Sequence, residues 1–232
     1  MSLPLLLSVP HAGLTVPPEA EPYCVLTERE IVEDGDGGAA EIYDLESSVA
    51  AFHTTNIARA IVDMNRSAND RRRDGVIKTH TCWNVPVWRE SLPDAVAERL
   101  IDRYHRPYHR RLSELAAEPG LRLAIDCHTM AAEGPPVGPD AGRERPRICL
   151  GYGEGTCPRD WVETLKSCFE ETIGPHVTIN DPFSGGYITR HHSAEMSWLQ
   201  LEMSRAPFLS NSEKNGAVLT ALTNLVARIQ SR

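Results

Sequence analysis

The chain has 232 residues, of which 41% are hydrophobic and 24% charged, a composition typical of folded globular proteins. It excludes the collagen-like, coiled-coil and low-complexity classes. The formal net charge of −8 at pH 7 argues against a general nucleic-acid binder, whose surface would be basic, and against binding to anionic membranes. We therefore expect neither a nucleic acid nor a membrane among its partners.

The hydrophobic pattern predicts alternating strands and helices. Residues 3–9 form a continuous apolar run that ends at Pro10, as in a buried strand. Thr27 and Glu30 have the spacing of a capping box, which predicts a short helix after residue 27. A helix over 93–117 is expected to be perturbed at Pro107 and to end at Gly120. The other expected strands are 56–64, 121–127, 147–151, 177–180 and 198–203, the other helices are 39–51, 158–171 and 211–229, and 131–146 is a loop.

This alternation predicts a single α/β domain over residues 1–232, with three layers and a mixed, mostly parallel sheet that has helices on both faces. The N-terminal apolar run is too short for a secretory signal, and no stretch approaches the roughly 20 apolar residues of a membrane span. We therefore predict a cytoplasmic protein. Its six cysteines form no C-x-x-C pair, so they are expected to be free thiols.

Polar side chains follow several predicted strands at the point where each strand ends. His11 follows the first strand, Asn65 and Arg66 follow the second, His128 follows the third, and Glu202 lies in the last. In an open α/β sheet, ligands bind beyond the carboxyl ends of the strands. Any one of these residues is more readily explained as structural. Their convergence indicates a functional site, because burying them unpaired would cost roughly several kcal/mol.

Two imidazoles and one carboxylate that leave a position open for water form a hydrolytic zinc site. His11 and His128 supply the imidazoles. The carboxylate is expected in the acidic, glycine-rich segment 33–38, where the spacing leaves Glu33, Asp34 and Asp36 open and Asp36 is favoured. The alternative for this segment is a solvated acidic loop that caps the following helix.

Two further residues are suited to catalysis and to substrate binding. Glu202 lies in an apolar strand, where a carboxyl group is expected to have a raised pKa, which suits a general base. Its alternative is a buried salt bridge, for example to Arg205. Arg66 can hold a substrate carboxylate in bidentate fashion, and its alternative is a surface ion pair.

Segment 180–192 mixes glycines with aromatic and basic residues, among them Tyr187, Arg190 and His191. It is predicted to be either a mobile surface loop or a loop that covers the substrate, with Arg190 as a second anion contact. His105 and His109 have an i, i+4 spacing on the predicted long helix. Without an H-E-x-x-H pattern, this pair is only a weak indication of metal binding.

Six segments together resemble the N-formylglutamate amidohydrolase family, and their order and approximate spacing match over nearly the whole chain. That family is similar in turn to the zinc carboxypeptidases, which implies a carboxypeptidase-like α/β fold. The segments are Ser8-Val9-Pro10-His11-Ala12-Gly13, Asp36 with Ile42-Tyr43-Asp44, Asp63-Met64-Asn65-Arg66, Tyr104-His105-Arg106-Pro107-Tyr108-His109, Asp126-Cys127-His128-Thr129-Met130, and Asn180-Asp181-Pro182 through Gly185-Gly186-Tyr187-Ile188-Thr189-Arg190-His191.

The resemblance implies a zinc ion held by His11, Asp36 and His128, although such ligands also accept other divalent ions such as manganese or cobalt. Glu202 resembles the catalytic glutamate, and Arg190 is expected to help stabilise the oxyanion. The implied activity is zinc-dependent hydrolysis of the amide of a small N-acyl amino acid, with N-formyl-L-glutamate as the example.

For the substrate, the resemblance implies that Asn65 and Arg66 hold its α-carboxylate and that Tyr187 and His191 line its pocket. The family usually has Trp and Asp where this chain has Gly37 and Ala40, and both changes are expected to reshape the pocket. Two alternatives stay open. The chain is either a carboxypeptidase-like hydrolase of a peptide or another amide, or a non-catalytic member that binds an anion or a partner protein.

Overall fold

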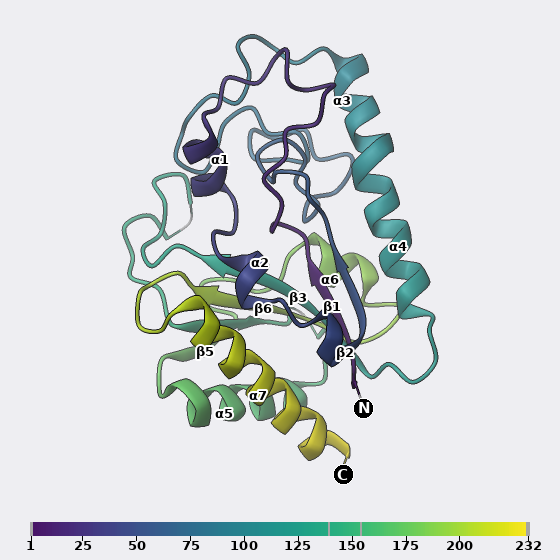
Figure 1. The fold of residues 1–232 in the computed structure, drawn as a ribbon, viewed down its shortest axis with the longest axis vertical. Coiled ribbons are helices and arrows are strands. Elements are labelled where there is room, and N and C mark those ends of the chain that lie inside the picture. The colour runs from purple at the N-terminus through teal and green to yellow at the C-terminus, as the bar shows by residue number, and fades with distance from the viewer. Residues whose placement is uncertain (1, 139, 154, 231–232) are drawn as a thin grey trace.

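The computed structural model of the chain describes residues 2–138, 140–153 and 155–230. Residue 139, inside the predicted loop 131–146, lies outside this description. The described residues form a sheet of six strands in the middle of the molecule (Figure 1). The strands are β1 (Leu3–Val9), β2 (Val49–Thr54), β3 (Leu123–Met130), β4 (Ile148–Gly151), β5 (Val177–Ile179) and β6 (Trp198–Ser204).

The strand order is β2-β1-β3-β6-β4-β5. Strands β2, β1, β3 and β6 are parallel to one another, whereas β4 pairs with β6 in the antiparallel direction and β5 is parallel to β4. The predicted mixed, mostly parallel α/β sheet is therefore confirmed. Because β1, β3 and β6 run in the same direction, their carboxyl ends lie at one edge of the sheet.

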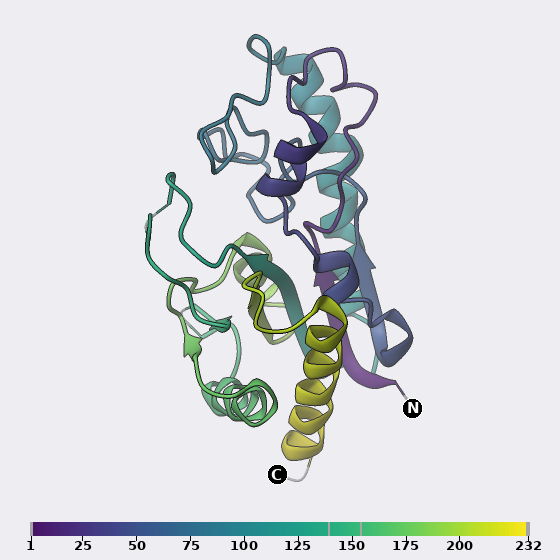
Figure 2. The same cartoon turned by 60° about the vertical axis from the view of Figure 1, so that its left-hand side comes forward.

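Helices cover both faces of the sheet, as the sequence predicts. In Figure 1 the sheet lies between the long helical segment that contains α3 and α4 on one side and the pair α5 and α7 on the other. Figure 2 shows that the loops of the N-terminal part lie at the opposite end of the molecule from α5 and α7. The helices are α1 (Glu28–Asp34), α2 (Ala39–Ile42), α3 (Asp94–Leu100), α4 (Arg106–Ala116), α5 (Arg159–Ile173), α6 (Tyr187–His192) and α7 (Asn211–Gln230), with a short 3-10 turn at Glu46–Ser48 and a π-helical turn at Ile101–His105.

Side chains alternate between the two faces along each strand. Leu5 and Leu7 of β1 pack in the core shared with α5 and α7, whereas Leu6 packs in the core shared with α3 and α4. On the α4 face, the alternate residues of the two central strands become polar toward their carboxyl ends. They are Ala124, Asp126 and His128 in β3, and Trp198, Gln200 and Glu202 in β6. This change of polarity within buried strands marks where the packed core gives way to a site.

Two predicted elements in the N-terminal third are wrong. The helix expected over 39–51 ends at Ile42, and residues from Val49 onward form β2, because pairing with β1 buries Val49 and Ala51. The strand expected over 56–64 is instead a buried turn, in which the Val62 N–H donates to the carbonyl oxygen of Ala58 over 3.1 Å. A short apolar run does not by itself distinguish a strand from another buried segment.

The long helix over 93–117 is present as α3, the π-helical turn and α4, but its irregularity precedes Pro107. It ends at Ala116, before Gly120. Residues Tyr187–His192, expected to lie in a loop, form the short helix α6. The capping box of Thr27 and Glu30 is confirmed, with the Glu30 carboxylate accepting the Thr27 N–H over 2.7 Å. Among the described residues, no helix has both the length and the apolar character needed to cross a membrane.

Candidate metal centre and catalytic pocket

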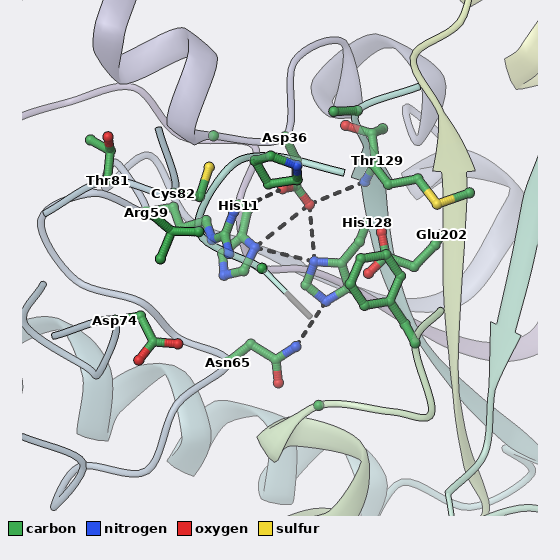
Figure 3. A pocket seen from close by; sticks show the side chains of 18 of the residues that line it. His11, Asp36, Arg59, Asn65, Asp74, Thr81, Cys82, His128, Thr129 and Glu202 are labelled. Carbon is green, nitrogen blue, oxygen red and sulfur yellow. Dashed lines mark hydrogen bonds and ion pairs between the residues drawn. The ribbon is translucent and has the colours of Figure 1, made fainter. Parts of the chain in front are cut away.

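Three buried side chains from separate parts of the chain converge beyond the carboxyl ends of the central strands (Figure 3). His11 follows β1, His128 lies in β3, and Asp36 lies in the turn between α1 and α2. The Nδ1 atom of His128 is 3.1 Å from Nδ1 of His11 and 2.9 Å from Oδ2 of Asp36, and Nδ1 of His11 is 3.6 Å from the same oxygen. All three ligand atoms lie within 4.8 Å of one another.

The opposite nitrogen of each imidazole faces another carboxylate. Nε2 of His11 lies 2.8 Å from Oδ1 of Asp63, and Nε2 of His128 lies 2.9 Å from Oδ2 of Asp126. Ionised carboxylates only accept hydrogen bonds, so each Nε2 donates its proton, and a neutral ring then presents an unprotonated Nδ1. Such carboxylate partners orient histidines that bind metals.

The centre therefore directs two nitrogen lone pairs and one carboxylate oxygen at the same point. Without a positive charge among them, these acceptors would repel one another, so the donor set fits a divalent cation. Burial acts to lower the pKa of His128, but Asp126 and Asp36 outweigh it and raise that pKa well above its usual range. Burial acts to raise the pKa of Asp36, but His11 and His128 hold it well below its usual range. The surroundings thus favour positive charge at this point.

Of the three acids that the spacing leaves open, Asp36 is the one that joins the histidines. Its Oδ2 also accepts the backbone N–H of Thr129 over 3.1 Å. Glu33 instead accepts a hydrogen bond from Arg29 on the surface of α1, and Asp34 accepts one from Lys78 over 2.8 Å in the interior. The three acids therefore have different partners, and only Asp36 is placed to share an ion with the two histidines.

The support of His11 extends into a buried network of charges that the sequence interpretation missed. Asp63 accepts a hydrogen bond from Nε of Arg59 over 3.3 Å and lies 3.7 Å from Nζ of Lys78. Burial acts to raise the pKa of Asp63, but His11, Arg66 and Arg59 hold it well below its usual range, so it is ionised. Asp63 lies two residues before Asn65 and Asp126 lies two residues before His128. This spacing is the sequence feature from which both supporting carboxylates could have been predicted.

A cavity of about 290 Å³ opens onto the three ligands, and Glu202 lines it beside them. Glu202 is only 6% exposed, and its carboxylate accepts a hydrogen bond from Nε2 of Gln200 over 2.6 Å. Burial raises the pKa of Glu202 to about 7, and the charge of Asp36 acts in the same direction. The carboxyl group can therefore exchange a proton near neutral pH. Glu202 makes no ion pair with Arg205 in the described structure, so the alternative of a buried salt bridge between them is not seen.

Asn65 and Arg66 line the same cavity, although they reach it from a turn and not from the end of a strand. Oδ1 of Asn65 accepts the N–H of Ile188 over 2.8 Å, and its Nδ2 lies 3.1 Å from Nε2 of His128. Arg66 donates from Nε to the carbonyl oxygen of Asp74 over 2.9 Å. Its Nη2 is 3.6 Å from the Asp74 carboxylate, so part of its guanidinium already has a partner.

His105 and His109 do not line the cavity, but they hold the turn that carries Asn65. Nε2 of His109 lies 2.9 Å from the carbonyl oxygen of Met64, and Nε2 of His105 lies 2.8 Å from that of Arg66. Carbonyl oxygens only accept, so both rings donate to the backbone on either side of Asn65. This spacing on the long helix therefore has a structural explanation.

Three residues predicted to contact substrate lie on α6, and none of them lines the cavity. Arg190 is exposed and donates to the carbonyl oxygen of Gly185 over 2.6 Å. The rings of Tyr187 and His191 stack with their centroids 4.8 Å apart. Gly185 and Gly186, which precede the helix, do line the cavity, so this segment meets the pocket through its backbone.

The N-formylglutamate amidohydrolase family matches residues 3–209 of the chain. The N-formylglutamate deformylase of Pseudomonas putida is 27% identical over 227 residues, which cover 91% of this chain and 84% of the relative. That of Pseudomonas aeruginosa is 27% identical over 223 residues, which cover 89% and 82%.

Two solved structures have the same fold. The crystal structure of N-formylglutamate amidohydrolase from Ralstonia eutropha JMP134 has a TM-score of 0.80 and 23% identity, and the match covers 99% of this chain and 94% of that one. A gene product of Agrobacterium tumefaciens has a TM-score of 0.76 and 18% identity, covering 99% and 90%. The resemblance seen in the sequence is confirmed, and the chain belongs to the N-formylglutamate amidohydrolase family, a family of amide-hydrolysing enzymes.

Proposed function

We propose that the chain is a metal-dependent hydrolase that removes the formyl group from N-formylglutamate. The relatives named N-formylglutamate deformylase support the substrate class. The observation that carries the proposal is the convergence of His11, Asp36 and His128 beside Glu202 in one cavity. The products would be formate and glutamate.

We propose zinc as the ion because two imidazoles and a carboxylate are a zinc donor set, and manganese or cobalt would suit the same ligands. Bound there, the ion would supply a Lewis acid that polarises the formyl carbonyl and lowers the pKa of a bound water to about 7. Asp63 and Asp126 would keep the two imidazoles in the tautomer that presents Nδ1 to the ion.

Glu202 would act as the general base and then as the general acid. Its pKa of about 7 lets the carboxylate accept a proton from the attacking water near neutral pH. The same carboxyl group would then donate that proton to the nitrogen of the leaving amine. The side chain lies in the strand next to His128 and lines the same cavity, which supports a place for it beside the reacting atoms.

Asn65 and Arg66 would bind the α-carboxylate and so fix the orientation of the formyl group. Holding a reacting group in the productive orientation can lower the activation barrier by roughly several kcal/mol. The Nη2 atom of Arg66 is 3.6 Å from the Asp74 carboxylate. A substrate carboxylate would therefore compete with Asp74 for the guanidinium.

The test is formate release by purified protein after treatment with a chelator and after reloading with zinc. We expect activity with N-formylglutamate that the chelator abolishes and that zinc restores. A panel of N-acetyl amino acids and short peptides run beside it tests the carboxypeptidase-like alternative. Protein that binds zinc and hydrolyses only peptides would contradict the proposed substrate, and protein that gains no metal would contradict the proposed centre.

A further inference from the structure

Six arginine and lysine side chains line the cavity beside the metal ligands, in a protein whose net charge is negative. A buried or half-buried cation normally has an anionic partner, because its desolvation is otherwise uncompensated. The hydrogen-bond and ion-pair partners of these six residues therefore show which cation is not neutralised within the protein and is available to an anionic ligand. They are Arg59, Arg66, Arg73, Lys78, Arg145 and Arg205.

Four of the six have a carboxylate partner within the protein. The N···O distances are 3.3 Å for Arg59 with Asp63, 3.6 Å for Arg66 with Asp74, 2.8 Å for Lys78 with Asp34, and 2.7 Å for Arg145 with Asp140. A fifth, Arg73, is exposed and donates to the side-chain oxygen of Asn84.

Arg205 is different, because it is half-buried and has no carboxylate within 4.0 Å among the described residues. Its Nη1 donates to the carbonyl oxygen of Gly35 over 3.0 Å, and its side chain makes no other hydrogen bond with the described residues. It directly follows β6, and its side chain lines the same cavity as Glu202. Most of its donors are left for a ligand.

The backbone that carries Arg205 is held on both sides. Nζ of Lys214, a buried residue of α7, donates to the carbonyl oxygen of Ser204 over 2.8 Å and to that of Ala206 over 2.9 Å. The N–H of Arg205 itself donates to the carbonyl oxygen of Met130 over 2.8 Å. These bonds fix the point from which the guanidinium extends, as a site for a specific ligand requires.

We propose that Arg205 binds the side-chain carboxylate of the substrate and thereby selects an acidic N-formyl amino acid. This inference rests on the proposed function, in which Asn65 and Arg66 bind the α-carboxylate. N-formylglutamate has a second carboxylate, which needs a second cation in the cavity. The planar guanidinium of Arg205 can bind it with two parallel hydrogen bonds, and the bound carboxylate supplies the anionic partner that Arg205 lacks among the described residues.

The test compares N-formylglutamate with N-formylglutamine, in which a carboxamide replaces the side-chain carboxylate. For Arg205→Gln we expect kcat/KM to fall on the order of 100-fold with N-formylglutamate, because the variant loses hydrogen bonds to a charged group. With N-formylglutamine we expect kcat/KM to fall only a few-fold. Arg205→Lys keeps the charge but loses the planar guanidinium. Its ratio of kcat/KM with N-formylglutamate to kcat/KM with N-formylglutamine should lie between those of the wild type and Arg205→Gln. The ratio is measured within one variant, so a partial loss of folded protein cancels.

Arg73→Gln is the matched control, because Arg73 lines the same cavity but is exposed and bonded to Asn84. We expect its ratio of kcat/KM values to equal that of the wild type. Calorimetry with the amino acids glutamate and glutamine gives a second measurement that needs no turnover. Arg205→Gln should weaken the binding of glutamate and leave that of glutamine unchanged.

The outcomes separate this inference from the proposed function. A wild type that hydrolyses N-formylglutamate while Arg205→Gln keeps the wild-type ratio would overturn the role of Arg205 alone. An equal loss with both substrates would also overturn it, because Arg205 would then act through the Gly35 turn next to Asp36. A wild type that hydrolyses neither compound would overturn the proposed function, and the role of Arg205 with it.

Discussion

His128 and Glu202 occupy paired positions in the neighbouring parallel strands β3 and β6. Both side chains lie on the α4 face, and neighbouring strands are about 4.8 Å apart, so the backbone itself sets the distance between the candidate ligand and the candidate base. Hydrogen bonds along both strands fix that register. The two residues are 74 positions apart in the sequence (202 − 128), and the sheet is what makes them neighbours.

The first prediction concerns Glu202→Gln, which removes the proton acceptor and keeps the shape of the side chain. We expect kcat/KM for formate release to fall by about 10² to 10⁴, the usual contribution of a general base. The zinc content should not change, because Glu202 is not among the three converging ligands. Metal analysis and formate assays check both points, and a fully active variant would show that another group accepts the proton.

The second prediction concerns pH. The folded structure raises the pKa of Glu202 from 4.5 to about 7, so the carboxylate form of the base increases as pH rises through that value. Activity should therefore rise with pH and level off. A bound divalent ion favours the carboxylate, so zinc should move the titration of Glu202 below its value in metal-free protein. Carbon-13 NMR of the carboxyl group with and without zinc measures this shift, and an unchanged midpoint would place the ion elsewhere.

The third prediction concerns the carboxylate behind His11. Asp63→Asn weakens the hydrogen bond to Nε2 of that ring, and losing such a partner typically costs about 10- to 100-fold in metal affinity. Competition with a zinc chelator gives the affinity. Asp102→Asn is the control, since Asp102 is an exposed acid that pairs with Arg106 on the long helix. Equal affinity in the two variants would separate Asp63 from the metal site.

The fourth prediction concerns acid stability. Burial acts to raise the pKa of Asp34, but Lys78 and Arg59 outweigh it and lower the pKa from 3.8 to about 2. A carboxyl group whose pKa is lower in the folded state than in the unfolded state stabilises the folded protein at pH values above its unfolded-state pKa. This stabilisation is lost as pH falls through the folded-state pKa. Asp34 should thus contribute about 2 kcal/mol at neutral pH that disappears between pH 4 and pH 2. Urea unfolding should show a flatter pH dependence for Asp34→Asn, and an unchanged slope would contradict the pairing.

The fifth prediction concerns the close approach of Gly186 to Asn65. A Cβ atom added at Gly186 would lie 2.1 Å from Nδ2 of Asn65, so Gly186→Ala must displace that side chain. We expect a raised KM for N-formylglutamate, because Asn65 helps to orient the substrate. Gly216→Ala in α7 is the control, since an added Cβ meets no atom within 4 Å there and should stabilise the helix by about 1 kcal/mol. An unchanged KM in Gly186→Ala would show that Asn65 does not contact the substrate.

Much of the fold was predictable because its strongest signals are local. The apolar runs of β1, β3 and β6 and the periodic patterns of α4, α5 and α7 gave elements of the right type in the right order. Apart from α6, which the pattern places in a loop, the elements of the wrong type fall between residues 39 and 64, where the pattern predicts a helix at β2 and a strand at the turn over residues 58–62. There the backbone conformation depends on pairing with β1 and on contacts with distant segments, which no short window contains.

The sequence by itself determined which chemical groups the site could contain, because His11, His128 and Glu202 stand at the ends of strands or within them. Only the tertiary structure decided how those groups are paired. It joined Asp36 and not Asp34 to the histidines, placed Asp74 beside Arg66, and left Arg205 without a carboxylate among the residues that the structure describes. The physical reason is that a charged group acts through its nearest partners in space, and here those partners come from distant parts of the chain.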